Sequence, residues 1–365
     1  MSIHLEALAH VPLKQSDNRV WRTYEGGALI DRWKQMPEEI DNNKPEQWIM
    51  STVTARGKNR PEHEGQSVIS TDNGSVHLKQ IIQSNPALFL GKALAKKYGD
   101  TGMLIKMLDS VERLTIQVHP DKAYAKNILN SEFGKTESWY ILNTRTIDGE
   151  EPVIYMGFKK HVTKAQWKAC FDKQDIEAML GCLHKIKVAP GDAYMIYGGV
   201  PHAIGAGCFL MEVQEPTDYT MRTEKTTPKG LKIGPELIHQ GVGEETMLDC
   251  FHYDTFTEEE AMANWKVEPE VLDQGDGYTY KTLFNKKHTP CFGLNELDLT
   301  DSYTLAARDT FYVMVIYAGE GLITCNEKQY PFKQADEIFI SAAIDQITIQ
   351  AHTPAKILLC YPPIV

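Results

Sequence analysis

The predicted fold rests on the stretch Leu114-Thr115-Ile116-Gln117-Val118-His119. Its apolar residues alternate with polar ones, which is the pattern of a β-strand whose two faces meet different surroundings. A strand with one polar face is most simply half-exposed to water. If that face instead points into a barrel, its side chains need a metal, a ligand or water, because an unpartnered buried polar group is costly. The polar side chains are those of Thr115, Gln117 and His119.

Two later segments offer further side chains that can bind a metal. Glu137 follows the strand, and Lys135 lies two residues earlier on the same face. His202 lies in the glycine-rich segment 197–207, where a backbone can approach a site closely. In the next strand, Glu212 alternates with apolar residues. Two strands with imidazole or acidic side chains on one face predict a barrel interior that holds a metal ion.

Four short motifs resemble those of type I phosphomannose isomerases (mannose-6-phosphate isomerases), in their short bacterial form. The resemblance begins near the tryptophan at position 21 and covers most of the chain. It implies a mainly β protein with two cupin-like (jelly-roll) β-barrel domains. The motifs are Gln117-Val-His-Pro120, Gly134-Lys-Thr-Glu137, Pro201-His-Ala-Ile-Gly205 and, after Arg222, Thr227-Pro-Lys229.

The resemblance also implies an activity and roles for individual residues. The chain would be a zinc-dependent aldose–ketose isomerase, an intramolecular oxidoreductase of carbohydrate metabolism that interconverts mannose 6-phosphate and fructose 6-phosphate. One Zn²⁺ per chain would lie in the first domain, and the second domain would bind no metal. The implied metal ligands are Gln117, His119, Glu137 and His202. The implied catalytic residues are Arg222, Glu212 and Lys135, and the substrate-binding residues are Lys106, Trp21, Glu46 and Thr115.

The chemistry of this isomerisation fits those residue types. Moving a proton between C1 and C2 of an open-chain sugar passes through an enediolate, whose negative oxygens a zinc ion stabilises as a Lewis acid. A Zn²⁺ ion bound by two neutral imidazoles, one carboxylate and one neutral amide would leave the site a net charge of +1. Arg222 suits the enediolate or the phosphate, because its guanidinium stays charged. Both Glu212 and Lys135 remain candidates for the base.

One segment departs from the family pattern. Residues 215–219 read Glu-Pro-Thr-Asp-Tyr, where better-known members carry Asn-Ser-Asp or Ser-Ser-Asp. These positions flank Arg222 and leave the identity of the sugar phosphate open. The alternatives are an isomerase of another sugar phosphate and a non-catalytic sugar-binding cupin regulator. A turnover assay distinguishes them.

The composition of the chain limits the class of protein and the partners that can be expected. A chain of 365 residues with 42% hydrophobic and 24% charged residues belongs with globular proteins rather than disordered or membrane ones. Its net charge of −11 argues against nucleic acid and acidic membrane surfaces as partners, so a small sugar phosphate is the expected one. Seven cysteines without CxxC pairs, and an N-terminus without a signal peptide, predict a cytoplasmic protein. The oligomeric state stays open.

The pattern of strands and helices predicts two domains. Residues 1–264 form the catalytic domain, with helical segments at about 76–99 and 163–183. The second helical segment is expected to pack over the entrance of the site. Residues 265–365 read as strand and turn throughout, and we expect them to form the second, metal-free cupin-like domain.

Overall fold

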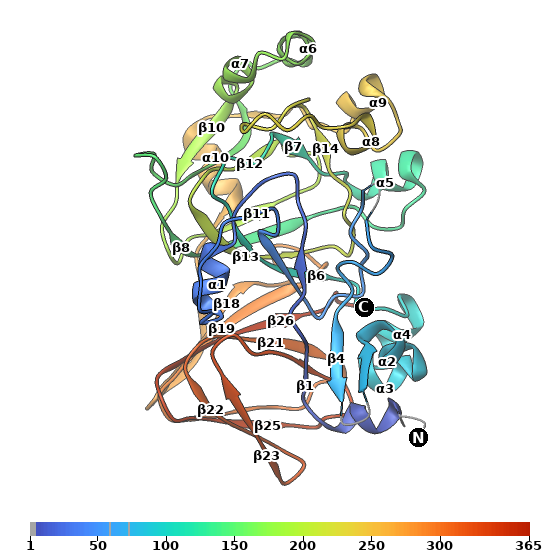
Figure 1. The fold of residues 1–365 in the computed structure, drawn as a ribbon, viewed down its shortest axis with the longest axis vertical. Helices are drawn as coiled ribbons and strands as arrows, with labels where there is room; N and C mark the ends of the chain where they lie inside the picture. Colours follow the sequence, from blue (N-terminus) through green and yellow to red (C-terminus); the bar gives the residue numbers. More distant parts are fainter. Residues whose placement is uncertain (1–4, 58–59, 72–73) are drawn as a thin grey trace.

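The computed structural model describes residues 5–57, 60–71 and 74–365. The prediction about a signal peptide therefore concerns a segment whose first four residues lie outside the described ranges. Two β-rich halves are stacked one above the other (Figure 1). Each half contains two sheets in which nearly all strand pairs are antiparallel, and the mainly β prediction is confirmed. No helix within the described ranges is long and apolar enough to cross a lipid bilayer.

The two sheets of the first half pack on each other. The first sheet has the order β16 (Lys266–Val267), β11 (Ala193–Ile196), β8 (Glu137–Thr144), β13 (Cys208–Gln214), β6 (Leu104–Asp109), β3 (Glu46–Ile49) and β2 (Arg19–Val20). The second has the order β10 (Leu183–Lys187), β9 (Val153–Lys159), β12 (His202–Ile204), β7 (Gln117–Val118) and β14 (Met221–Arg222). Strand β15 (Thr255–Phe256) pairs with β9 in parallel.

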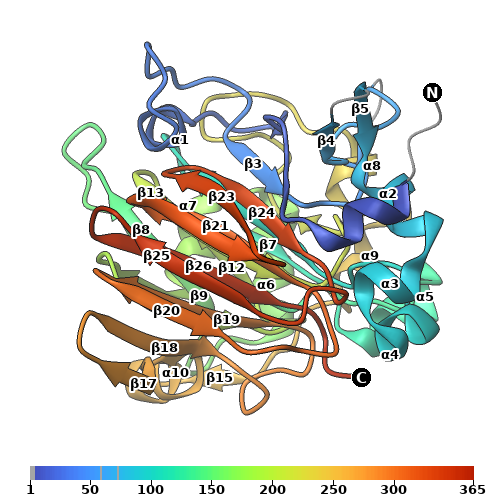
Figure 2. The same cartoon turned by 90° about the horizontal axis from the view of Figure 1, so that it is seen from below.

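The second half repeats this arrangement with a larger and a smaller sheet, seen from below in Figure 2. The larger sheet has the order β1 (Leu13–Lys14), β24 (Glu337–Ile340), β21 (Tyr312–Ala318), β26 (Ala355–Tyr361), β19 (Gly293–Leu299), β18 (Tyr278–Phe284) and β17 (Glu270–Gly275). The smaller has the order β20 (Ser302–Leu305), β25 (Ile347–Ala351), β22 (Glu320–Cys325) and β23 (Lys328–Lys333).

Side-chain alternation along β13 divides the core of the first half. Leu210 packs between the two sheets with Ile141 and Ile204. Met211 points the other way and joins a cluster that includes Val313 of the second half. Each face of this strand is therefore buried, and the two halves share one continuous apolar interface.

The helices lie outside the sheets. The predicted segment 76–99 begins with the end of β5 (Gly74–His77), the partner of β4 (Val68–Thr71). It continues as α2 (Leu78–Ser84), α3 (Pro86–Leu90) and α4 (Lys92–Lys97). Asn85 caps α3 by accepting from the backbone N–H of Leu88, and Pro86 fills the first helical position, where no N–H is needed. The remaining helical elements are a 3₁₀-helix (Leu5–His10), α1 (Ala28–Trp33), α5 (Lys122–Leu129), α8 (Pro235–Ile238), α9 (Glu244–Leu248) and α10 (Glu258–Trp265).

The predicted helical insertion at 163–183 forms α6 (Lys164–Lys173) and α7 (Ile176–Gly181), at the end of the molecule far from the second half (Figure 1). Trp167 of α6 packs on Phe158 of β9, and Phe171 of α6 belongs to the same apolar cluster. The expectation that this segment covers the site entrance is wrong, because none of its residues lines the cavity described below. The apolar side chains of α6 pack instead on the outer face of the sheet that contains β9.

Two strands pair with a sheet of the half to which the predicted domain division does not assign them. Strand β1, near the N-terminus, pairs with β24 of the second half. Strand β16, just after residue 265, pairs with β11 of the first half. The division at residues 264 and 265 stays a prediction, and these two strands tie the halves together.

A buried acid lies where β1 meets β24. Glu337 Oε2 accepts hydrogen bonds from the amides of Gln47 (2.8 Å) and Gln15. Its Oε1 is buried without a hydrogen-bond partner in the described ranges. Burial raises the pKa of Glu337 to about 7, although Lys34 and the two amides oppose the shift, and Asp17 adds to it.

We expect Glu337→Gln to stabilise the protein at pH 8 but not at pH 4. The folded-state pKa lies above the ordinary value, so the stabilising effect of the protonated acid is complete at low pH. It is lost as the pH rises from about 4.5 to about 7. The loss amounts to at most roughly 3 kcal/mol. Urea denaturation at several pH values measures it. Equal stability changes at pH 4 and pH 8 would contradict the prediction.

Candidate active site and metal centre

The register of the second sheet places three predicted site residues in one row. His202 of β12 is directly opposite Gln117 of β7, and Gln117 is opposite Arg222 of β14. Residues paired across antiparallel strands point to the same face, with neighbouring Cβ atoms about 5 Å apart. Two ligand candidates and the candidate catalytic arginine thus become neighbours, although they are far apart in the sequence.

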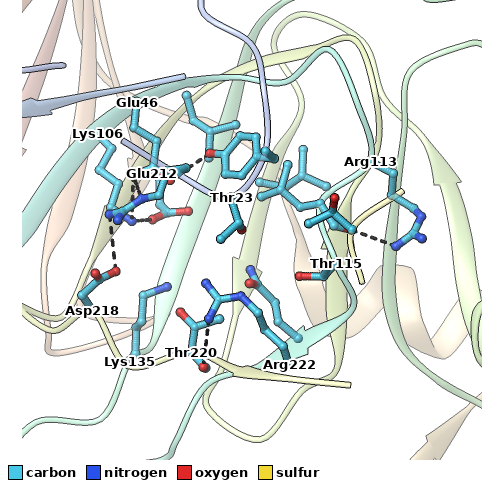
Figure 3. A pocket seen from close by; sticks show the side chains of 17 residues that line it. Thr23, Glu46, Lys106, Arg113, Thr115, Lys135, Glu212, Asp218, Thr220 and Arg222 are labelled. Atoms are coloured by element: carbon cyan, nitrogen blue, oxygen red, sulfur yellow. Dashed lines mark hydrogen bonds and ion pairs between the residues drawn. The ribbon is translucent and has the colours of Figure 1, made fainter. Parts of the chain in front are cut away.

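The first sheet contributes a second row. Glu212 of β13 pairs with Lys106 of β6 on one side and with Trp139 of β8 on the other. Lys106 pairs in turn with Trp48 of β3. Glu137 lies two residues before Trp139 and therefore shares its face. The cavity lies between the two rows, and Figure 3 shows the side chains that line it.

Three buried side chains converge at one end of this cavity. The ligand atoms of His119, Glu137 and His202 all lie within 4.8 Å of one another. His119 Nε2 lies 3.1 Å from Glu137 Oε2, and His202 Nε2 lies 3.5 Å from Glu137 Oε1. These residues come from both sheets, so the cluster joins them.

The hydrogen bonds of the imidazoles decide what this cluster can bind. His119 Nδ1 lies 2.9 Å from the carbonyl of Tyr219, and His202 Nδ1 lies 2.8 Å from that of Val200. A carbonyl only accepts, so both Nδ1 atoms carry the proton and both Nε2 lone pairs face Glu137. Glu137 Oε1 has no hydrogen-bond partner among the described residues. Acceptors aimed at one another in this way fit a bound cation.

Electrostatics put these groups in the protonation states that a metal requires. Burial and the charge of Lys135 lower the pKa of His119 to about 3, and burial also lowers the pKa of His202. Burial alone would raise the pKa of Glu137, but Lys135 and His119 outweigh it and hold it well below the ordinary value. Neutral imidazoles and an ionised carboxylate are the forms that bind zinc.

Gln117 and Lys135 complete this end of the cavity. The side-chain amide of Gln117 lies 3.2 Å from His202 Nε2. The ammonium of Lys135 lies 2.6 Å from His119 Nε2 and also contacts Glu137. A positive group therefore already meets the lone pairs of the cluster, and Lys135 is within reach of anything bound there.

The opposite wall is a chain of alternating charges. Lys106 Nζ donates to Glu212 Oε1 at 2.8 Å and lies 3.8 Å from Glu46 Oε2 (Figure 3). Arg22 donates to the same Glu46 oxygen at 2.8 Å, and Tyr24 donates to the other at 2.8 Å. Although burial raises the pKa of Glu46, Arg22 and Lys106 lower it to about 2. The charges on this wall are balanced among themselves.

Glu212 is held on both carboxylate oxygens. Lys106 contacts Oε1, and the indole N–H of Trp139 donates to Oε2 at 3.2 Å. Burial and the charge of Glu137 raise the pKa of Glu212, while Lys106 opposes the shift. A buried carboxyl with a raised pKa is suited to proton transfer near neutral pH.

Arg222 differs from the other cations of the cavity. Its Nη1 donates to the carbonyls of Leu237 (2.7 Å) and Thr220 (3.4 Å). Within the described ranges, no carboxylate forms an ion pair with it. Two acids nearby in sequence are engaged elsewhere, Asp218 with Arg22 and Glu224 with Arg113. Burial lowers the pKa of Arg222 to about 10, so it still carries a charge at pH 7.

The two remaining predicted residues lie at different places. Thr115 is buried and lines the cavity. Trp21 borders an adjoining recess instead, with the guanidinium of Arg60 above its ring at 4.6 Å. All the other predicted residues line the cavity or belong to the cluster of His119, Glu137 and His202.

Several residues of the site were not predicted, among them Arg22, Tyr24 and Trp139. Trp139 could have been found, because it shares the strand parity of Glu137. Arg22 and Tyr24 lie in the irregular segment after β2, where no periodicity shows which way a side chain points.

Comparisons with known proteins show which family the chain resembles. A family model of the phosphomannose isomerase type I catalytic domain matches residues 25–140, and one of the mannose-6-phosphate isomerase cupin domain matches residues 281–359. The mannose-6-phosphate isomerase of Escherichia coli (strain K12) is 41% identical, with 76% of this chain and 83% of that protein covered. The mannose-6-phosphate isomerase ManA of Bacillus subtilis (strain 168) is 25% identical, with 68% of this chain and 72% of that protein covered.

Solved structures share the fold. The mannose 6-phosphate isomerase of Bacillus subtilis matches with a TM-score of 0.74 at 22% identity, covering 96% of this chain and 99% of that one. A zinc-bound mannose 6-phosphate isomerase matches with a TM-score of 0.71 at 15% identity, covering 97% of this chain and 100% of that one. The predicted cupin-type fold is confirmed.

We expect Zn²⁺ to raise the melting temperature of the metal-free protein and to have little effect on His202→Ala. A ligand that binds only the folded state stabilises it, by about 2.7 kcal/mol at a concentration 100 times its dissociation constant. Differential scanning calorimetry after dialysis against chelator measures the shift. His352→Ala, which changes an exposed histidine of the second half, is the control. An equal shift in His202→Ala would show that zinc binds elsewhere.

Proposed function

Because the chain belongs to the type I phosphomannose isomerase family, we propose that its buried cavity interconverts mannose 6-phosphate and fructose 6-phosphate. The observation that carries the proposal is the convergence of His119, Glu137 and His202, with both Nε2 lone pairs facing the carboxylate. Lys135 and Arg222 reach the same cavity, which provides positive charge for an anionic substrate.

We assign one Zn²⁺ per chain to this cluster, with the oxygen of the Gln117 amide as a fourth ligand. The amide already lies beside His202, and its oxygen and nitrogen can exchange places by a rotation of the side chain. When bound, the ion would act as a Lewis acid for negative charge that develops on the substrate oxygens. We propose no metal in the second half.

Glu212 is the group that we propose moves the proton. In the aldose-to-ketose direction it takes the proton from C2, which gives an enediolate, and returns it to C1. The proton of the C2 hydroxyl ends on the oxygen of C1, so that C1 becomes an alcohol and C2 a ketone. Lys106 and Trp139 hold the two carboxylate oxygens of Glu212 and fix its direction. Its raised pKa makes Glu212 a stronger base than an ordinary carboxylate.

Lys135 and Arg222 are the cations that we propose act on the substrate. Lys135 would donate to a sugar oxygen beside the cluster. Arg222 would stabilise the enediolate, because its charge is not balanced by an ion pair within the described ranges. Thr115 has a hydroxyl on the cavity wall that can donate to the substrate.

Three further predicted residues would shape the cavity more than they would bind the phosphate. Lys106 was predicted to bind the substrate, but its ammonium is already paired with Glu212 and close to Glu46. We therefore assign Lys106 and Glu46 to the support of the base. Trp21 would border the route to the cavity, because it lines the adjoining recess.

A sugar phosphate is the partner that the cavity supports, and we propose that the protein works in the cytoplasm. All seven cysteines are free thiols, and most of them are buried. Such thiols fit a reducing compartment.

The purified protein should convert mannose 6-phosphate to fructose 6-phosphate, and chelation should abolish the activity. A coupled assay measures turnover, and elemental analysis should find one zinc per chain in the wild type and much less in His202→Ala. An inactive, folded and zinc-loaded wild type would contradict the function and favour a sugar-binding regulator. Turnover of a different sugar phosphate only would redirect it to another isomerase.

Arg222→Ala should lower kcat by about 100- to 1,000-fold, the usual cost of removing a group that stabilises charge in the transition state. If Arg222 only bound the phosphate equally throughout the reaction, KM would rise and kcat would stay nearly unchanged. Arg32→Ala, at an exposed arginine on α1, is the matched control. Near-normal turnover in a folded, zinc-loaded Arg222→Ala would contradict the assignment.

A further inference from the structure

Arg22, Asp218 and Arg222 meet in one recess that adjoins the cavity. Asp218 lies four residues before Arg222, and it is the negative charge that most favours the charged form of that arginine. Two guanidinium groups and one carboxylate therefore share a small, largely buried space. The question is which of the two arginines takes the carboxylate.

The carboxylate of Asp218 is committed on both of its oxygens. Arg22 Nη2 lies 3.4 Å from Oδ1, and the backbone N–H of Arg56 donates to Oδ2 at 2.9 Å. Arg222 makes neither contact and donates instead to the carbonyls of Leu237 and Thr220. Asp218 is thus turned toward Arg22.

Arg22 is itself fixed in place by several contacts. Its Nε donates to Glu46 at 2.8 Å, and its guanidinium lies 4.8 Å from the centre of a Trp48 ring. Only 9% of the residue is exposed. A fork of donors can bind two carboxylates at once from one position, which a lysine cannot do.

We propose that Arg22 is a positioning residue that holds Asp218 away from Arg222, so that the Arg222 guanidinium stays available to the substrate. The proposal rests on the role of Arg222 given under the proposed function. Without Arg22, Asp218 and Arg222 would be left as an acid and a cation, both partly buried, in one recess. Buried charges of opposite sign pair strongly when no other partner exists, and the pair would neutralise Arg222.

A double-mutant cycle on Arg22 and Asp218 tests this mechanism. We expect Arg22→Leu to lower kcat by about tenfold or more, because it should remove much of the effect of a free Arg222. In the Asp218→Asn background, the same change should lower kcat by less than about threefold, since no carboxylate is left to capture Arg222. A residue with a merely structural role would give losses that multiply.

Two further variants and one structure keep the test decisive. If Arg22→Leu does not fold, Arg22→Lys takes its place, because it retains a positive charge. Asp218→Asn should then reduce the loss of kcat that Arg22→Lys causes, as it should for Arg22→Leu. A crystal structure of either Arg22 variant should show an Asp218 oxygen within about 3 Å of the Arg222 guanidinium.

The outcomes separate this proposal from the proposed function. Independent, multiplying losses, or an Asp218 side chain that stays away from Arg222 in the variant structure, would overturn the role of Arg22. An inactive wild type would overturn the isomerase activity instead. Rescue by Asp218→Asn together with the Asp218–Arg222 contact would establish the positioning role.

Discussion

The site depends on one constraint, the burial of many charged side chains between two facing sheets. A buried charge is tolerated only with a partner, and the antiparallel registers supply the partners. Glu212 pairs with Lys106 across one sheet, while His202, Gln117 and Arg222 form a row across the other. Those rows fix the distance between the groups before any ligand arrives. The site is therefore preorganised by strand pairing, which is more rigid than a loop.

The balance of charge divides the cavity into two functional walls. On one wall, Lys106 lies between Glu212 and Glu46, so its charge is compensated, and we propose that it orients Glu212 as the base. On the other, Lys135 faces lone pairs of the cluster and Arg222 donates only to carbonyls. Lys135 is paired with Glu137, so the cation without an ion-pair partner among the described residues is Arg222, and it lies where we propose that the enediolate forms. This distribution explains how a chain of net charge −11 can accept an anionic sugar.

Much of this arrangement could be predicted from the sequence, because every second residue of a strand points to the same face of its sheet. Only Gln117 and Val118 of the predicted strand form a ladder, yet Thr115 and Gln117 both reach the cavity. Parity did not reveal that β1 would pair with β24, since that contact joins residues more than 300 positions apart. It also could not find Arg22, whose direction is set by Glu46 and Asp218 rather than by a repeating pattern. The apolar stripe of α6 indicated a buried face but not which surface it covers.

The proposed activity depends on a cation held by His119, Glu137 and His202. X-ray absorption at the zinc edge of the loaded protein tests it most directly, because nitrogen and oxygen ligands lie at about 2.0–2.2 Å and sulfur at about 2.3 Å. We predict a first shell of nitrogen and oxygen only, with the outer-shell scattering of two imidazole rings, which becomes that of one ring in His202→Gln. A sulfur shell, or a spectrum unchanged by that substitution, would place the metal elsewhere and contradict the central claim.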